Sequence, residues 1–267
     1  TQNFIMSADQ SATLVAVPVL AGAILRVVLG FFVDKVGAKK TALTSQFIVV
    51  VGLFYAYYKG ETITYNELLA VAFILGFAGG SFAVALPQAG QWYPPKLQGV
   101  VLGLAGAGNI GVVIDFIFAP KIAQIWGWQS VFLVGAVLSL FIFIVYIFMA
   151  KDAPASVYKP NPKKLKDYMK LLKDKDTWWF NLFYSISFGG FVGFAVYMKV
   201  FLMGTYKPEM AAFGLDILSE SNVMVTAGYF GALCIFAGAI LRPVGGAIAD
   251  KLGGIKSLYF FYGVVCL

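Results

Sequence analysis

The sequence predicts an all-α membrane protein, and three observations lead to this prediction: the composition, the length of the apolar stretches and an internal repeat. Of the 267 residues, 60% are hydrophobic and only 12% are charged. Soluble domains carry about 25% charged and 45–50% apolar residues, so this composition belongs in lipid. The chain has no histidine and two cysteines, both in apolar stretches, which argues against haem, histidine–zinc sites and a disulfide framework.

Seven stretches have about the length of 20 apolar residues that a helix needs to cross the hydrocarbon core. They cover residues 12–33, 41–58, 68–92, 100–119, 131–149, 179–202 and 222–248, and an eighth begins near Ser257. The chain begins at Thr1 and has no visible signal peptide. We therefore expect an internal fragment that lacks both ends.

Lysine is distributed unevenly over the segments that connect these stretches. Fourteen lysines lie in one alternating set of connections, which begins after the first stretch, and only Lys59, Lys121 and Lys207 lie in the other set. Because positively charged connections stay in the cytoplasm, the lysine-rich set is predicted to be cytoplasmic. The net charge of +7 is thus spread over short loops and not gathered on one basic face, which argues against nucleic acid as a partner.

The longest connection divides the chain into two helical bundles. Within it, Leu165, Tyr168, Met169 and Leu172 recur at helical spacing among lysines, a pattern typical of an amphipathic helix on the inner membrane surface. We expect an N-terminal half bundle over residues 1–150 that lacks its first helix, a cytoplasmic linker over 151–178, and the start of a C-terminal half bundle over 179–267.

Residues 21–40 and 237–256 form an internal repeat, with 12 of 20 positions identical at a constant offset of 216 residues. Both copies contain the run Ala-Gly-Ala-Ile-Leu-Arg, with Arg26 in the first and Arg242 in the second. Both end in Gly-x-x-x-Asp-Lys-x-Gly, which comprises Gly30, Asp34, Lys35 and Gly37 in the first copy and Gly246, Asp250, Lys251 and Gly253 in the second. The copies lie in the first and seventh stretches, so the period is six helices.

Parallel repeats of six helices are the architecture of the major facilitator transporters, and the Asp-Lys motif resembles the cytoplasmic loop motif of that superfamily. This resemblance implies a helical bundle of two pseudo-symmetric six-helix halves, of which the chain covers about helices two to nine of twelve.

The two arginines are predicted to lie near the middle of the membrane. Each precedes the aspartate of its repeat by eight residues, or ~12 Å along a helix. A charged side chain at that depth costs at least about 2.5–3.5 kcal/mol and needs a partner. No carboxylate recurs with the arginines, so a mobile anion is the natural counter-charge; the alternative is that each guanidinium bonds backbone carbonyls or extends to the surface. The planar guanidinium fits flat oxyanions such as nitrate and nitrite, but also carboxylates and phosphates.

Four further segments resemble the nitrate/nitrite porter family: residues 76–83, 92–99, 105–111 and 183–191. The resemblance implies that Arg26 and Arg242 bind the substrate, that Asn109 donates a hydrogen bond to it, that Tyr184 donates to it or orients an arginine, and that Phe82 covers the flat anion. It also implies that signature glycines let the helices slide past one another during transport. These glycines are Gly79, Gly80, Gly106, Gly108 and Gly111.

The resulting functional hypothesis is nitrate/nitrite antiport by alternating access, carried out without a cofactor or metal by a monomer in the lipid bilayer of the plasma membrane. Two uncompensated guanidiniums should prevent the empty carrier from returning, which favours exchange. Two alternatives stay open: proton-coupled nitrate symport, in which Asp115 carries the proton, and an organic-anion or phosphate exchanger of the same fold. A membrane enzyme would need convergent acid/base or metal groups, which the spans lack, whereas a sensor would bind the anion without moving it.

Overall fold

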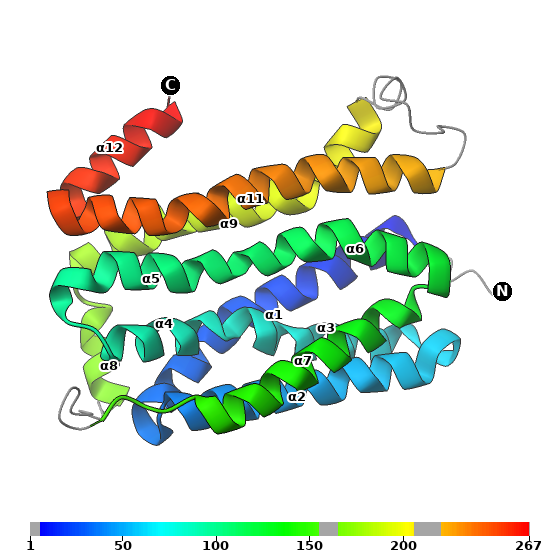
Figure 1. Ribbon diagram of the computed structural model, residues 1–267, viewed down its shortest axis with the longest axis horizontal. Helices are drawn as coiled ribbons and strands as arrows, with labels where there is room; N and C mark the ends of the chain where they lie inside the picture. Colours follow the sequence, from blue (N-terminus) through cyan, green and yellow to red (C-terminus); the bar gives the residue numbers. More distant parts are fainter. Residues whose placement is uncertain (1–5, 155–164, 206–219, 267) are drawn as a thin grey trace.

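The computed structural model describes residues 6–154, 165–205 and 220–266, and in these ranges the regular structure is entirely helical (Figure 1). The helices are α1 (Ala8–Val36), α2 (Ala38–Lys59), η1 (Gly60–Thr62), α3 (Tyr65–Gly80), α4 (Phe82–Gln91), η2 (Pro95–Leu97), α5 (Gln98–Gly106), η3 (Ala107–Asn109), α6 (Ile110–Trp126), α7 (Gln129–Met149), α8 (Leu165–Leu171), α9 (Lys175–Thr205), α11 (Glu220–Leu252) and α12 (Gly254–Cys266).

Each of the seven expected spans lies within helix, but two of them are interrupted. The third is divided between α3 and α4 at Ser81, and the fourth is divided between α5 and α6 by the 3₁₀ turn η3. Six described helical segments are long and apolar enough to cross a membrane. The sixth expected span lies within the long helix α9.

The sequence repeat is also a repeat of backbone conformation. Gly37 ends α1 and Gly253 ends α11, with φ of 94° and 88°, in the left-handed region that glycine tolerates best. Their amides donate to the carbonyls of Val33 and Ala249, at 3.0 and 2.9 Å. Both pairs keep the 216-residue offset, so the two copies turn the chain in the same way at the same end of the bundle. We call this the cytoplasmic end, because the lysine distribution assigns it to the cytoplasm.

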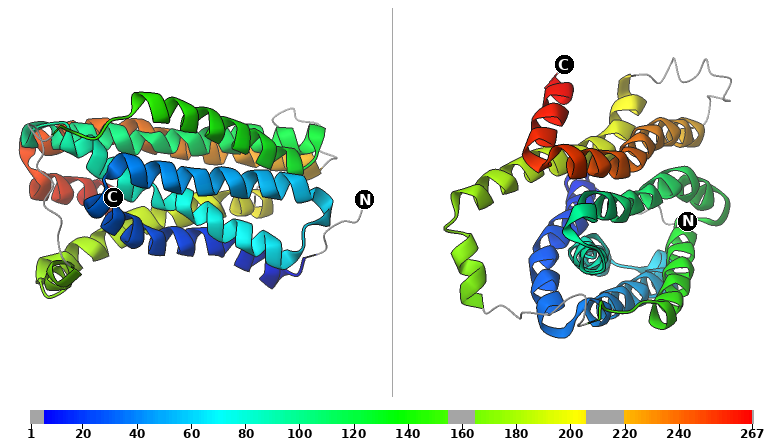
Figure 2. Two further views of the ribbon diagram at one scale, coloured as in Figure 1. Left: turned by 90° about the horizontal axis from the view of Figure 1, so that it is seen from below. Right: turned by 60° about the vertical axis from the view of Figure 1, so that its left-hand side comes forward.

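The helices form two groups that meet along α11 (Figure 2). In the first group, α1 packs on α3 and α2 packs on α7; in the second, α9 and α12 pack on α11. Helix α11 lies along both α5 and α6, where Val113, Ala232 and Ile235 form a buried cluster with Phe116, Ile117 and Phe191. The broken helix α5–α6 is therefore the main contact between the two groups.

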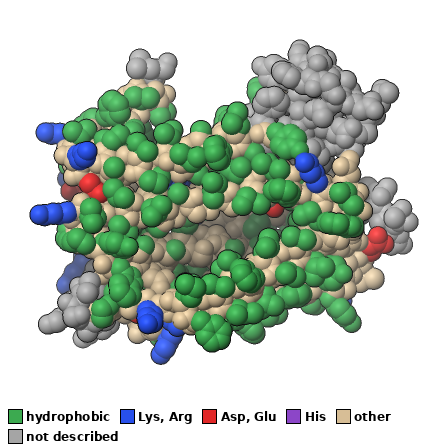
Figure 3. Space-filling model, in the orientation of Figure 1, with side chains coloured by type: hydrophobic (Ala, Val, Ile, Leu, Met, Phe, Trp, Pro, Cys, Tyr) green, Lys and Arg blue, Asp and Glu red, His purple; other side chains and the backbone are tan. Residues whose placement is uncertain are grey.

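Hydrophobic side chains are spread along the face shown in Figure 3, as expected for a surface in contact with lipid. Val27, Phe148 and Met149 are each more than 70% exposed, and most of the visible Lys and Arg side chains gather near one end of the face in Figure 3. An apolar surface of this extent is foreign to monomeric soluble proteins. The chain is an integral multi-pass membrane protein. Helix α8 lies across the cytoplasmic end, within the expected linker, of which residues 155–164 lie outside the described residues.

Candidate functional site

Arg26 lies on α1 where that helix is in close contact with α3. A Cβ added to Gly76 would come within 2.5 Å of the Ala21 Cβ, so only glycine permits this approach, as is common where membrane helices pack tightly. The approach brings the Gly79 carbonyl to Arg26, whose Nε donates to it at 3.3 Å. The guanidinium group is thus anchored at its Nε by a neutral backbone group.

Arg242 lies on α11 and is held by the break between α5 and α6. In a continuous α-helix the Ile110 amide would bond the Gly106 carbonyl; here it bonds Ala107 instead. The Gly106 carbonyl accepts from Arg242 Nη1 at 3.1 Å. The Asn109 amide, oriented so that its oxygen faces the donors, accepts from Nη2 at 3.0 Å and from Nη1 at 3.1 Å.

One aromatic ring contacts both arginines. The guanidinium carbon of Arg26 lies 4.8 Å from the centroid of the Phe188 ring and that of Arg242 lies 5.9 Å from it, so the two carbons are at most the sum of these distances, 10.7 Å, apart. Both distances are within the range of a cation–π interaction. The expected symmetry mates therefore meet at one place in the bundle, between α1, α9 and α11.

Further rings surround Arg242 and Phe188. The Arg242 guanidinium carbon lies 5.9 Å from the Phe82 ring and 5.7 Å from the Phe191 ring. Tyr184 stacks on Phe188 with ring centroids 5.2 Å apart, and its side chain is half exposed. Tyr184 thus packs against the ring that contacts both arginines. We call Arg26, Phe82, Asn109, Phe188 and Arg242 the arginine cluster.

Two members of this arrangement differ from the sequence-based expectation. Asn109 is expected to donate a hydrogen bond to the anion, and in the structure its oxygen accepts from Arg242. Phe188 is not among the site residues predicted from the sequence, although it lies one helical turn after Tyr184 on the same face of α9. That i to i+4 spacing is the signal that could have found it within a run rich in phenylalanine.

The signature glycines differ in what surrounds them. Gly106 is buried, and a Cβ there would lie 3.0 Å from Arg242 Nη1. Gly80 packs on Leu25 and Leu29 of α1, whereas Gly108 and Gly111 have nothing within 4 Å of an added Cβ. The role in helix contact thus falls on Gly79, Gly80 and Gly106 in the described structure. Asp115 is exposed on α6, six residues after Asn109.

The aspartates of the two Asp-Lys motifs bond to different elements. Asp250 accepts from the amides of Gly99 at 2.7 Å and Val100 at 2.9 Å, so its charge caps the N-terminus of α5, where the helix dipole favours an anion. Asp34 accepts from the hydroxyl of Tyr168 on α8. Of the other motif residues, Lys35 lies over the Phe31 ring at 4.4 Å, Lys251 is exposed, and Gly30 has nothing within 4 Å of an added Cβ.

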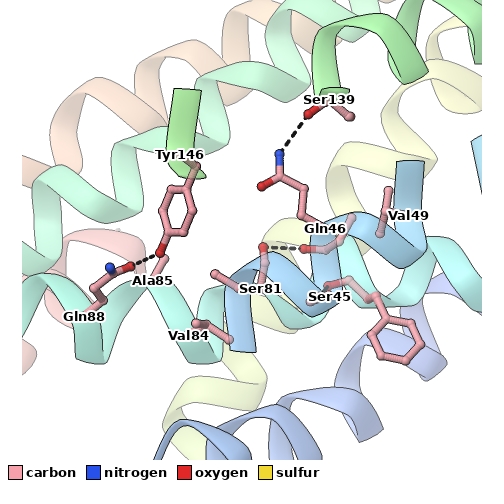
Figure 4. Close-up of a pocket in the computed structure, with 12 residues that line it drawn as sticks. Ser45, Gln46, Val49, Ser81, Val84, Ala85, Gln88, Ser139 and Tyr146 are labelled. Carbon is pink, nitrogen blue, oxygen red and sulfur yellow. Dashed lines mark hydrogen bonds between the residues drawn. The ribbon is translucent and has the colours of Figure 1, made fainter. Parts of the chain in front are cut away.

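A cavity of about 290 Å³ lies elsewhere, within the first group of helices (Figure 4). Gln46 Nε2 donates to the Ser139 carbonyl at 3.0 Å, and the Tyr146 hydroxyl donates to Gln88 Oε1. The cavity shares no lining residue with the arginine cluster, and the sequence analysis did not anticipate it. Its walls come from α2, α3, α4 and α7 and the Ser81 break.

Comparison with known proteins settles the family. The family model described as Major Facilitator Superfamily matches residues 1–267. The chain belongs to this superfamily. That membership confirms the fold expected from the six-helix repeat.

Individual superfamily members are similar to the chain over nearly all of its length. It is 29% identical to the "Nitrite extrusion protein" of Bacillus subtilis (strain 168), covering 100% of this chain and 62% of the relative. It is 29% identical to the "Probable nitrate/nitrite antiporter NarK1" of Thermus thermophilus, with 100% and 58% covered. For the "Probable nitrate transporter NarT" of Staphylococcus epidermidis the identity is 28%, with 100% and 64% covered. The chain thus spans about six tenths of the length of these curated relatives.

Proposed function

We propose that this chain forms the larger part of a carrier that exchanges nitrate for nitrite across the plasma membrane, as its resemblance to the nitrate/nitrite porter family implies. The observation that carries the proposal is the position of Arg26 and Arg242, which approach one Phe188 ring from the two helix groups. Neither arginine forms a salt bridge with a described carboxylate; the two described salt bridges lie at Lys59 and Lys170. The names of the three relatives support the same substrates.

The chemistry of the cluster fits a small, flat monoanion. Two guanidiniums supply donors in planar forks that match the oxygens of an oxyanion, and the charge-assisted hydrogen bonds they form are roughly twice as strong as neutral ones. Phe82 and Phe188, with ring centroids 6.3 Å apart, offer apolar surfaces that can cover a delocalised anion. A tetrahedral anion such as phosphate cannot lie flat against these rings, so the shape of the cluster favours nitrate and nitrite.

Exchange follows from the charge of the empty cluster. Each unpaired guanidinium that is closed off from water in the membrane costs at least about 2.5–3.5 kcal/mol. A bound monoanion reduces this cost, so the loaded carrier changes conformation more readily than the empty one. We propose that the carrier acts as a monomer surrounded by lipid.

The proposal is tested with the full chain in lipid vesicles that contain either nitrite or an impermeant anion such as gluconate. Uptake of isotopically labelled nitrate should depend on internal nitrite or nitrate. Equal uptake into gluconate-filled vesicles would contradict exchange. If that uptake followed an imposed pH gradient, the carrier would be a proton-coupled symporter.

Competition tests the identity of the substrate. External nitrite should displace labelled nitrate, whereas phosphate, formate and larger organic anions at the same concentration should not. Displacement by phosphate or organic anions would show that the carrier is an exchanger of a broader range of anions.

A further inference from the structure

The two arginines are held unequally. In the described part of the chain, Arg26 donates only through Nε, to the Gly79 carbonyl, whereas both terminal nitrogens of Arg242 are bonded, Nη1 to Gly106 and Asn109 and Nη2 to Asn109. The terminal fork of Arg26 is therefore free of described acceptors. An arriving anion can therefore accept directly from the terminal nitrogens of Arg26, whereas those of Arg242 already donate to Gly106 and Asn109.

The acceptors that hold Arg242 are both neutral. The Gly106 carbonyl and the Asn109 amide oxygen accept three hydrogen bonds from the terminal nitrogens of the guanidinium, and so reduce the cost of leaving buried donors unpaired. They do not neutralise its charge, because dipoles cannot replace a counter-ion. The anion-free cluster is thus ordered at Arg242 but retains the full charge of both arginines.

We infer that Asn109 is a positioning residue that makes transport depend on exchange. Its neutral oxygen accepts hydrogen bonds from Arg242 while the site is empty, and the anion replaces it as the acceptor when it binds. This inference rests on the proposed exchange function. It attributes the need for an internal anion to the side-chain oxygen of Asn109. Because the acceptor carries no charge, only a transported anion compensates Arg242. A carboxylate in the same place would be a permanent counter-ion and would let the empty carrier return.

The decisive variant is Asn109→Asp, which has nearly the same shape. A carboxylate about 3 Å from a guanidinium stays ionised, since an opposite charge this close favours the charged form. We expect nitrate uptake into gluconate-filled vesicles to rise at least about tenfold over wild type, which corresponds to ~1.4 kcal/mol, while nitrate is bound more weakly. Asn109→Gln is the matched control; it keeps a neutral acceptor and should remain dependent on internal anion.

A conformational measurement covers the case in which the variant transports nothing. Spin labels at Lys40→Cys and Lys256→Cys, equivalent exposed positions on the two helix groups, with Cys234→Ser and Cys266→Ser, report the separation of the groups by electron resonance. Without anion, the wild type and Asn109→Gln should give one separation, and Asn109→Asp should give two.

Two results would overturn the inference. One is an Asn109→Asp carrier that exchanges anions and still requires internal anion. The other is an inactive Asn109→Asp carrier whose anion-free label separations match the wild type. Failure of the exchange proposal itself is seen separately, because the wild type would then take up nitrate without internal anion.

Discussion

At the scale of single residues, the arginine cluster depends on groups that carry no charge. Gly106 supplies a carbonyl to Arg242, and its lack of a side chain makes room for the guanidinium. Phe188 presents its ring to both arginines. These contacts fix where the positive charges lie and leave them uncompensated, which is the property that an anion carrier needs.

Substitution of Gly106 by alanine should weaken anion binding. The added methyl group would lie 3.0 Å from Arg242 Nη1 and 3.2 Å from its Cδ, so the side chain must move away from its present position. Overpacking of this kind costs about 1–3 kcal/mol, and we expect the half-saturating nitrate concentration for exchange to rise about tenfold. Gly108→Ala lies two residues later, in the 3₁₀ turn η3, and has nothing within 4 Å of the added Cβ. It should have a much smaller effect; equal effects would contradict the assigned contact.

Loss of the Phe188 ring should also weaken binding. Phe188→Leu keeps apolar volume and removes the π face, and a cation–π contact is worth about 0.5–2 kcal/mol. We expect the half-saturating nitrate concentration to rise about tenfold. Phe191→Leu is the comparison, because Phe191 contacts only Arg242 among the two arginines in the described structure. The shared-ring geometry is wrong if Phe191→Leu has the larger effect.

At the scale of helices, the apolar lengths predict where the long helices lie, whereas the breaks within them are not predictable in the same way. Residues 105–111 are small and apolar apart from Asn109, so they fit a continuous helix as well as a 3₁₀ turn. The released Gly106 carbonyl depends on the position of Arg242, which lies 136 residues away. The orientation of Asn109 has the same cause. Sequence thus identified the two arginines and the asparagine, and only tertiary contacts define what each one bonds.

The cap on α5 leads to a prediction about closure at the cytoplasmic end. Asp250→Ala removes a charged acceptor from two amides at the N-terminus of α5, and loss of such a cap costs about 0.5–2 kcal/mol. The variant should open more often toward the cytoplasm, measured as faster labelling of Val100→Cys by a membrane-impermeant maleimide added from that side. Lys251→Ala, at the exposed neighbouring position, should leave labelling unchanged. Unaltered labelling in Asp250→Ala would show that the Asp250 cap does not contribute to closure of the cytoplasmic end.

At the scale of the whole molecule, one-for-one exchange of two monoanions moves no net charge. The work done by a membrane potential, about 2.3 kcal/mol per charge per 100 mV, therefore vanishes over a complete cycle. We expect a potassium diffusion potential of either sign, set with valinomycin, to leave the equilibrium distribution of nitrate and nitrite unchanged. A distribution that shifts with the sign of the potential would indicate net charge movement, as in symport with more than one proton or in uniport.

Between Gly99 and Gly246, helices α5 and α11 touch backbone to backbone: a Cβ on Gly246 would lie 2.0 Å from the Gly99 carbonyl oxygen, and one on Gly99 would lie 2.3 Å from that of Gly246. Because backbone atoms form this contact, no flexible side chain lies between Gly99 and Gly246 that could move aside. A single methyl group at Gly99 or Gly246 would hold α5 and α11 apart, so the cytoplasmic end of the carrier could not close. Such a carrier would still receive ions from the cytoplasm but could not present its binding site to the opposite side.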